Sequence, residues 1–295
     1  MKEAKNNIHG VILLDKPGGM SSNQALQKVK HRFNARKAGH TGSLDPLATG
    51  LLPICLGQAT KVSEYLLNSH KRYTTVIRLG ETTDTLDSEG EVQERREVLV
   101  EDEQLEGALD QFRGEIKQVP PMYSALKKGG QPLYKLARSG QEVERKARDM
   151  TVFELCAKRL DQHHVELDVH CSSGFYIRSL AHDLGQALGC GAHVVELRRT
   201  HIKSISVAQA HSLENIEQGS LKSVLLPIDS LLGELPKTQI SEAQATSLQH
   251  GKQTSAAGLE PICLTRLYRG ADSLFAIGEI TARNTIKTHK IFVDI

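Results

Sequence analysis

The stretch GHTGSLDPLATG at residues 39–50 places one carboxylate, Asp45, in a loop with three glycines and a proline. Glycine is used where the backbone takes positive φ or passes close to another group. Pro46 fixes its own φ and biases Asp45 away from the helical region. A carboxylate held on so rigid a turn is a candidate nucleophile, because it can trap an electrophilic carbon. In the alternative interpretation, Asp45 only caps its own turn.

The residues before this loop predict the elements that must position it. The run VILLD at 11–15 is typical of a short apolar strand, and it leads into a Lys-Pro-Gly-Gly turn. Ser21 and Gln24 form a capping-box pattern, followed by apolar residues at helical spacing up to Phe33. A strand and a helix therefore precede the loop.

Two further segments carry polar groups at the ends of predicted elements. Residues 73–79 alternate with the two-residue period of a strand, and Tyr73 opens its apolar face. A second alternating strand at 165–171 is followed by a Ser-Ser-Gly turn that carries Tyr176 and Arg178 into a helix. These side chains are candidates to meet in one site.

The order of elements indicates the fold class. A helix is predicted from Leu105 to a stop near Gly114, another from 177 to 188, and a strand in HVVELRRTHI, where Val195 and Leu197 share a face. Strands and helices intermingle without regular alternation. We therefore expect an α+β fold with a mixed, mostly antiparallel central sheet flanked by helices.

Two prolines and a glycine between residues 225 and 236 indicate a connector between two domains. A capped helix at Ser241 and β-like runs such as LFAIGEI and HKIFVDI follow it. We expect a main domain over 1–235 and a small, mainly β domain over 236–295.

Composition places the chain among globular proteins, with 39% hydrophobic and 24% charged residues in 295. No apolar run approaches the roughly 18 residues of a membrane span, and the polar N-terminus is unlike a secretion signal. The five cysteines are odd in number and form no Cys-x-x-Cys pair. Free thiols in a reducing cytoplasm are therefore expected, and neither the cysteines nor the thirteen histidines show metal-ligand spacing.

The net charge of +2 does not by itself suggest nucleic acid, but its distribution does. The segment from Leu126 to Arg148 carries seven Lys or Arg and two Glu, with Tyr134 and several glycines between them. This is either a solvated face or a mobile basic flap, at about 120–148, that attracts a phosphate backbone. Its candidate RNA-binding cations are Lys127, Lys128, Arg145 and Lys146.

Six ordered blocks between residues 9 and 200 together resemble the pseudouridine synthases of the TruB type. They are GVILLDKPGGMSSNQALQKVK, AGHTGSLDPLATGLLPICLGQATK, KRYTTVIRLGETTDTLDSEGEV, PPMYSALKKGGQPLYKLARSGQEVERKAR, CSSGFYIRSLAHDLG and GCGAHVVELRRT. The resemblance implies the pseudouridine synthase fold and the isomerisation of the T-loop uridine of tRNA, conventionally number 55. Exchanging one glycosidic bond for another needs no redox cofactor, ATP or metal, so none is expected.

The resemblance also implies roles for single residues. Asp45 matches the catalytic nucleophile of the family, and Arg178 matches the arginine that pairs with it, orients it and keeps it ionised. Tyr73 matches an active-site tyrosine that stacks on the extruded uracil or assists proton transfer. Tyr176 and Leu197 match positions that line the uracil pocket, although aromatic and leucine side chains at strand ends usually only pack in a core.

The remaining correspondences concern RNA binding and loop support. His40 matches a histidine that helps to fill the space left by the flipped nucleotide, which assigns it to binding. Lys16 matches a residue that supports the catalytic loop. The basic flap matches an insertion that closes over the T-arm, and the C-terminal segment resembles a reduced PUA-like RNA-binding domain. The expected partner is the T-arm stem-loop of tRNA, bound by a monomer without a membrane or an obligate protein partner.

Two alternatives stay open at the level of sequence. The first is an RNA-binding chaperone that folds tRNA, with secondary or absent catalysis. The second is a synthase of the same fold that acts on another RNA within a ribonucleoprotein. The order of covalent steps, through C1′, C6 or a glycal, does not follow from the residues.

Overall fold

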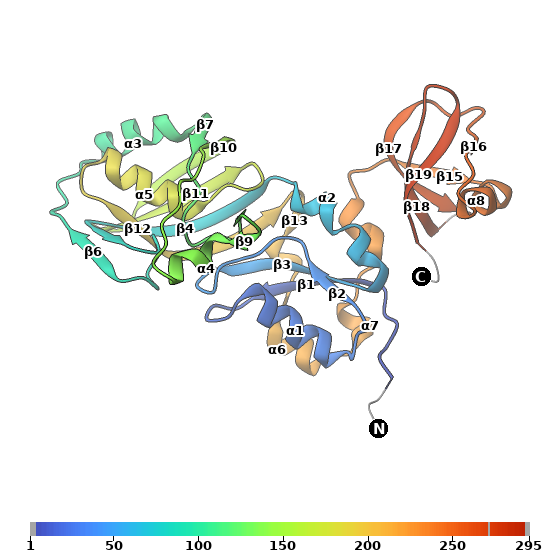
Figure 1. The fold of residues 1–295 in the computed structure, drawn as a ribbon, viewed down its shortest axis with the longest axis horizontal. Coiled ribbons are helices and arrows are strands. Elements are labelled where there is room, and N and C mark those ends of the chain that lie inside the picture. The colour runs from blue at the N-terminus through green and yellow to red at the C-terminus, as the bar shows by residue number, and fades with distance from the viewer. Residues whose placement is uncertain (1–3, 271, 293–295) are drawn as a thin grey trace.

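The computed structural model describes residues 4–270 and 272–292 of the chain. Within these residues a large mixed sheet crosses the molecule, and a smaller five-stranded sheet lies near the C-terminus (Figure 1). The large sheet has the main order β14-β1-β3-β12-β4-β11-β10-β7, with β2 paired to β3 and β13 to β12. Its strands are β1 Gly10–Lys16, β2 Ala38–His40, β3 Thr49–Leu56, β4 Lys71–Leu79, β7 Gly114–Gln118, β10 Arg148–Arg159, β11 His164–Cys171, β12 Ala192–Ile202, β13 Ile205–Ser206 and β14 His211–Ser212.

Most neighbouring strands of the large sheet are antiparallel. The parallel pairs are β1 with β14 and β3 with β12. The expected α+β class and the mixed, mostly antiparallel sheet are therefore confirmed.

The described helices are α1 Ser22–Arg32, α2 Ser63–Leu67, α3 Asp102–Leu109, α4 Leu133–Arg138, α5 Ile177–Ala187, α6 Leu213–Gln218, α7 Leu221–Val224 and α8 Glu242–Gln249, with 3-10 turns at Gly57–Lys61, Asp110–Phe112, Val207–Gln209 and Ile228–Leu232. They include four that the sequence predicts, α1, α3, α5 and α8, of which α8 packs in the core of the C-terminal sheet. Ser21 caps α1 in a complete capping box with Gln24, as the pattern predicts. In the described part of the chain, no helix is long and apolar enough to cross a membrane.

Strand β4 lies in the middle of the large sheet, between β11 and β12. Its residues alternate between buried and partly exposed, with Tyr73, Thr75, Ile77 and Leu79 on the buried face. Helices α3 and α5 cover that face in the main apolar core, to which Leu109 and Leu180 belong. The period-two pattern is thus explained by a sheet with one packed face.

Strand β1 is apolar at successive positions because both of its faces are covered. Ile12 and Leu14 join the core beneath α1, whereas Val11 and Leu13 belong to a second apolar cluster. That second cluster includes Tyr268 of the C-terminal sheet. A continuous apolar run in a strand indicates burial on both sides.

The C-terminal sheet has the order β15-β17-β18-β19-β16. Its strands are β15 Lys237–Ile240, β16 Thr254–Ser255, β17 Ile262–Arg269, β18 Ser273–Ile280 and β19 Thr285–Ile291, and α8 begins at the predicted Ser241 cap. A small core of its own supports it, so a separate mainly β domain is present. The last residues of the predicted HKIFVDI strand, 293–295, lie outside the described residues.

The two sheets are also joined to each other. The Tyr268 hydroxyl hydrogen-bonds the Asp229 carboxylate of the connector, and Lys61 Nζ donates to the Ile291 carbonyl oxygen at 2.7 Å. Because the second apolar cluster spans both sheets, the C-terminal sheet packs directly against the region around β1.

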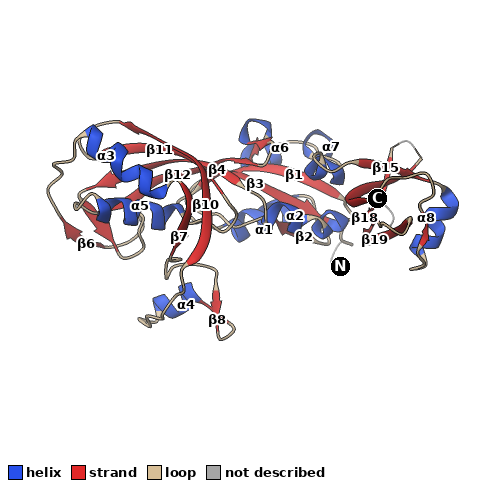
Figure 2. Ribbon diagram, turned by 90° about the horizontal axis from the view of Figure 1, so that it is seen from above, coloured by secondary structure: helices blue, strands red, loops and turns tan. Residues whose placement is uncertain are grey.

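The basic segment forms a projection from the large sheet. After β7 the chain makes the short ribbon β8 Lys127–Lys128 with β9 Gln131–Pro132, then α4, and returns as β10. Figure 2 shows α4 and β8 standing away from the body of the molecule. A second small ribbon pairs β5 Glu81–Thr83 with β6 Val92–Arg95. The predicted flap is therefore a protrusion with short strands and a helix of its own, attached between β7 and β10.

Gly50 is the position in β3 where a side chain cannot be accommodated. It has φ +100° and pairs with Arg199 of β12, and a Cβ there would lie 2.3 Å from the Arg199 carbonyl oxygen. The glycine thus lets the strand that follows the Asp45 loop approach β12 closely.

We predict that Gly50→Ala lowers the free energy of unfolding by at least about 1–3 kcal/mol, because positive-φ strain and a backbone clash act together. Chemical denaturation measures the change. The matched control is Gly107→Ala in α3, where nothing lies within 4 Å of the added Cβ. This control should stabilise the protein by about 0.5–1 kcal/mol. Equal stability of the two variants would contradict the close approach of β3 and β12.

Candidate active site

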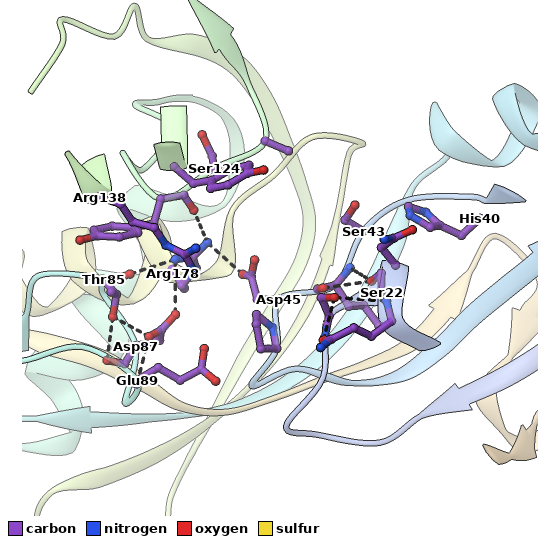
Figure 3. A pocket seen from close by; sticks show the side chains of 18 residues that line it. Ser22, His40, Ser43, Asp45, Thr85, Asp87, Glu89, Ser124, Arg138 and Arg178 are labelled. Atoms are coloured by element: carbon purple, nitrogen blue, oxygen red, sulfur yellow. Dashed lines mark hydrogen bonds and ion pairs between the residues drawn. The ribbon is translucent and has the colours of Figure 1, made fainter. Parts of the chain in front are cut away.

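A cavity of about 750 Å³ lies where the Asp45 loop faces the start of α1, the turn after β5 and the base of the flap (Figure 3). Its lining residues are Ser21, Ser22, Asn23, Gln24, His40, Ser43, Leu44, Asp45, Pro46, Thr85, Asp87, Glu89, Tyr123, Ser124, Ala125, Tyr134, Arg138 and Arg178. The cavity contains both charged partners that the sequence analysis paired.

Asp45 and Arg178 form an ion pair, with Arg178 Nη2 2.9 Å from Asp45 Oδ2. The Arg178 side chain is 5% exposed, whereas that of Asp45 is 40% exposed. Arg178 also donates to the carbonyl oxygens of Thr85 (3.0 Å) and Tyr123 (2.7 Å). The guanidinium is thus fixed in the wall, and the carboxylate that it holds faces the cavity.

Asp87 is a second carboxylate on the same arginine, and it is not among the candidates named from the sequence. Its Oδ2 lies 3.3 Å from Arg178 Nη1, and its side chain is 4% exposed. Figure 3 marks this pair with a dashed line. Asp87 Oδ1 accepts hydrogen bonds from the Thr85 hydroxyl (2.6 Å) and the Glu89 amide (3.1 Å). Arg178 therefore bridges one buried and one accessible carboxylate.

The electrostatics of the Asp45 carboxyl follow from this arrangement. Burial raises the pKa of Asp45 above its ordinary value of 3.8, and the charge of Asp87 raises it further. Arg178 and, more weakly, Lys16 oppose this increase in pKa. Two carboxylates thus share the charge of Arg178, and burial disfavours the ionised form of Asp45.

The backbone of the Asp45 loop is fixed from α1 and from β1. The Leu44 amide donates to Ser22 Oγ at 2.7 Å, and that hydroxyl donates back to the Leu44 carbonyl oxygen at 3.0 Å. Lys16 is fully buried and donates to three carbonyl oxygens, including that of Pro46 at 3.4 Å. Burial lowers the Lys16 pKa to about 8. These contacts agree with a loop-supporting role for Lys16.

The turn-cap alternative for Asp45 finds no support in the geometry. The Ala48 amide closes the turn on the Asp45 carbonyl oxygen, at 3.1 Å. Among the residues that the structure describes, the Asp45 carboxylate accepts no hydrogen bond from the backbone, and its partner is Arg178. The side chain is therefore directed away from its own turn.

Tyr73 and Leu197 lie close to this site but do not line the cavity. Each is 8% exposed, on the neighbouring central strands β4 and β12. Burial raises the pKa of Tyr73 to about 12, and the Asp45 charge contributes to this increase. Both side chains belong to the packed core behind the cavity wall.

Tyr176 also lies outside the lining set, at the N-cap of α5. Its backbone is clamped by Gln118, whose amide accepts from the Tyr176 N–H (2.8 Å) and donates to its carbonyl oxygen (3.0 Å). The ring is half-buried, and the pKa of its phenol is raised by burial and also by the nearby Asp45. Tyr176 is thus fixed at the start of the helix that carries Arg178.

His40 is the remaining sequence candidate, and it does line the cavity. It ends β2, three residues from Ser43 on the loop. Burial lowers the His40 pKa, and the charge of Arg199 lowers it further. A histidine kept neutral in this way can stack or hydrogen-bond without adding a charge.

The flap reaches the cavity through side chains that the sequence analysis did not single out as site residues. Tyr134 and Arg138 of α4 line the cavity. Of the four cations named from the sequence, Lys127, Lys128 and Lys146 are exposed, and Lys128 donates to the Glu144 carbonyl oxygen. Arg145 is turned inward instead, where Nη1 donates to the Pro120 carbonyl oxygen at 3.2 Å.

The chain matches two parts of one known family. Residues 30–177 match the TruB family pseudouridylate synthase (N-terminal domain), and residues 178–233 match the tRNA pseudouridylate synthase B C-terminal domain. The chain belongs to the TruB family of pseudouridylate synthases. The two matched segments carry all of Asp45, Tyr73, Arg178 and Leu197, and they end before the five-stranded sheet.

Close relatives extend this similarity to the whole chain. The chain is 49% identical to tRNA pseudouridine synthase B of Stutzerimonas stutzeri over 99% of its own length and 98% of the relative's. Identity and coverage are the same for the protein of that name from Pseudomonas aeruginosa. A solved structure of an H/ACA ribonucleoprotein bound to a substrate RNA containing 2′-deoxyuridine includes a similar chain, with TM-score 0.74 and 25% identity over 97% of this chain and 85% of that one.

Asp87 lies in the segment KRYTTVIRLGETTDTLDSEGEV, which the sequence comparison with the family included, but residue types alone did not single it out. Asp84, Asp87 and Glu89 all lie in its acidic turn, and sequence spacing does not say which of them faces Arg178. Glu89 also lines the cavity, and its pKa is raised by burial and by the charges of Asp87 and Asp45. In the described residues, no group of three or more His, Cys, Asp or Glu is arranged to hold a metal ion.

We predict that Asp45→Asn raises the melting temperature at neutral pH. Because the folded state raises the Asp45 pKa, its ionised form costs stability above that pKa, and the cost disappears as pH falls and the carboxyl binds a proton. Thermal melts of wild type and variant from about pH 8 to about pH 4 measure this effect. The gain should shrink on acidification. A gain that grows on acidification would contradict the raised pKa.

Proposed function

We propose that this protein converts the T-loop uridine of tRNA, number 55, to pseudouridine, with Asp45 as the nucleophile. The observation that carries the proposal is the Asp45–Arg178 ion pair, whose accessible carboxylate faces a cavity of about 750 Å³. It occurs in a chain 49% identical, over nearly its full length, to proteins named tRNA pseudouridine synthase B.

The reaction exchanges one bond to the ribose for another. The N1–C1′ bond of the uridine breaks, the uracil turns, and a C5–C1′ bond forms. The hydrogen on C5 is released and N1 takes up a proton, so atoms and electrons balance without an oxidant or a reductant. The protein must therefore supply a nucleophile, a proton acceptor and a pocket in which the detached base stays bound.

The geometry suits Asp45 for the first task. The carboxylate is accessible and its partner arginine is fixed by two carbonyl oxygens, so the nucleophile is oriented before substrate arrives. Asp87 holds the other side of Arg178. Removing Arg178 would leave two carboxylates without a counter-charge, and breaking such a pair typically costs about 3–5 kcal/mol.

The uridine must leave its stack to reach Asp45, which costs a few kcal/mol that protein contacts can offset. The cavity has the size of a small-molecule site and accepts a single nucleoside. We propose that the uracil reaches Tyr73, Tyr176 and Leu197, which lie outside the residues that line this cavity. His40, on the opposite side of the loop, would occupy the space that the nucleotide leaves.

The flap supplies contacts outside the cavity. Lys127, Lys128 and Lys146 are exposed on a projection whose helix α4 reaches the cavity through Tyr134 and Arg138. A basic protrusion with an aromatic residue beside the catalytic cavity suits the phosphates and splayed bases of an RNA loop. We propose that the flap binds the T-arm, and that the chain acts alone as a monomer.

We predict that the purified protein releases about one equivalent of tritium from a T-arm stem-loop that carries 5-tritiated uridine, and that Asp45→Asn lowers the rate at least about 1,000-fold. Binding of the RNA to the variant should change little, because Asp45 contacts the reacting nucleotide and not the backbone. Full activity of the variant would exclude Asp45 as nucleophile. RNA binding by the wild type without tritium release would favour a tRNA-folding chaperone or another RNA substrate.

We also predict a strong salt dependence of RNA affinity, with log K falling by about 0.7–0.9 per phosphate contacted for each tenfold rise in salt. Replacing Lys127, Lys128, Arg145 and Lys146 together by Gln should flatten this slope. A triple variant that keeps Arg145 and replaces the three lysines tests the inward contact of Arg145. Because the Arg145 guanidinium is turned toward Pro120, the salt slope of the triple variant should be as flat as that of the quadruple variant. An unchanged slope in the quadruple variant would mean that the flap is only a solvated face.

A further inference from the structure

Arg199 is a fully buried cation, 1% exposed, on the central strand β12. Its Nε donates to the Leu51 carbonyl oxygen (2.8 Å), its Nη2 to that of Gly42 (3.1 Å), and its Nη1 to that of Ser43 (3.5 Å). These three oxygens lie on both sides of Asp45 along the chain. One guanidinium therefore ties the start of the catalytic loop to the strand that follows it.

The hydrogen-bond acceptors of this buried cation are carbonyl oxygens, where a carboxylate is the usual partner. Among residues 4–270 and 272–292, no Asp or Glu forms an ion pair with Arg199. A buried charge without an acidic partner is costly and is kept where its hydrogen bonds serve a purpose. The charge of Arg199 acts on two neighbouring basic groups, since it lowers the pKa of both His40 and Lys71.

Arg199 also lies between β3, which follows the Asp45 loop, and β4, which carries Tyr73. In the sheet it pairs with Gly50 of β3 on one side and with Tyr73 of β4 on the other. Its guanidinium interacts with the Tyr73 hydroxyl and lowers the pKa of that phenol, against the larger opposite effect of burial. Because a guanidinium only donates hydrogen bonds, the Tyr73 oxygen can only accept from it. The Tyr73 hydroxyl hydrogen is thereby left for another acceptor.

We propose that Arg199 is a positioning residue of the isomerisation, which fixes the Asp45 loop and the Tyr73 hydroxyl relative to one another through a single buried guanidinium. The inference rests on the proposed function, since it assumes that Asp45 and Tyr73 act on the same nucleotide. Arg199 itself touches no substrate, because it is buried beneath the loop and does not line the cavity. Its loss should slow the chemical step and leave RNA affinity largely intact.

The test compares single-turnover tritium release and RNA affinity for Arg199→Gln and Arg199→Lys. Arg199→Gln should lower the single-turnover rate at least tenfold while the Kd for the stem-loop changes less than threefold. Arg199→Lys keeps the charge with fewer donors, so its rate should lie between those of wild type and Arg199→Gln. Wild-type protein in the same assay first establishes the activity, so a failure of the proposed function is seen separately.

Two matched controls separate positioning from general destabilisation. Lys71→Gln removes another buried cation, which donates to the carbonyl oxygens of Leu66, Leu67 and Ser69. Arg198→Gln makes the same substitution one residue away, at an arginine paired with Asp15. Assayed below their melting temperatures, both should keep a rate within threefold of wild type. Equal rate losses in Lys71→Gln and Arg199→Gln would overturn the proposal.

A spectroscopic readout does not depend on activity. With 3-fluorotyrosine at position 73, the fluorine chemical shift at neutral pH reports the surroundings of that phenol. The shift should differ between Arg199→Gln and the otherwise wild-type protein, and it should be unchanged in Arg198→Gln. An identical shift in all three proteins would overturn the proposal. If Arg199→Gln does not fold, Arg199→Lys replaces it in both measurements, with a smaller change expected in the same direction.

Discussion

Much of this structure depends on one electrostatic constraint, which is that burial disfavours the charge of the Asp45 carboxylate. Asp45 lies near Asp87, and Arg178 is the cation that joins them. Arg178 can do this because two more of its donors are taken by carbonyl oxygens, so it is fixed before any ligand arrives. A guanidinium suits this position because its fork geometry serves two carboxylates and two carbonyl oxygens at once.

The same constraint explains how the loop around Asp45 is supported. Lys16 and Arg199 are both fully or almost fully buried and donate to main-chain carbonyl oxygens of the loop or its flanks. A buried cation that donates to carbonyl oxygens fixes the backbone, and it does so without a further carboxylate beside Asp45. The lowered pKa of Lys16, about 8, reflects the cost of such burial. Rigidity is thus obtained from buried cations, of which Lys16 also favours a negative charge at Asp45.

The flap and the C-terminal sheet attach to this centre in different ways. The base of the flap is held directly by the site, because Arg178 donates to the Tyr123 carbonyl oxygen and α4 lines the cavity. The C-terminal sheet instead packs behind β1 through a shared apolar cluster. An RNA that bound the flap would therefore lie next to Arg178, whereas contacts on the C-terminal sheet would act at a distance from the reacting nucleotide.

The sequence by itself determined several of the strands, the capped helices and the α+β class, because apolar periodicity and caps are local signals. The correspondence of Asp45 and Arg178 came from the resemblance of ordered sequence blocks to a known family. Only the tertiary structure decided which carboxylate of the turn at residues 84–89 joins Arg178, and that Arg145 turns inward. It also left Tyr73, Tyr176 and Leu197 outside the lining of the cavity and placed Arg199 beneath the loop. The contacts of Arg178 and Arg199 join segments more than 90 residues apart, and that of Arg145 joins segments 25 residues apart, so no local pattern encodes them.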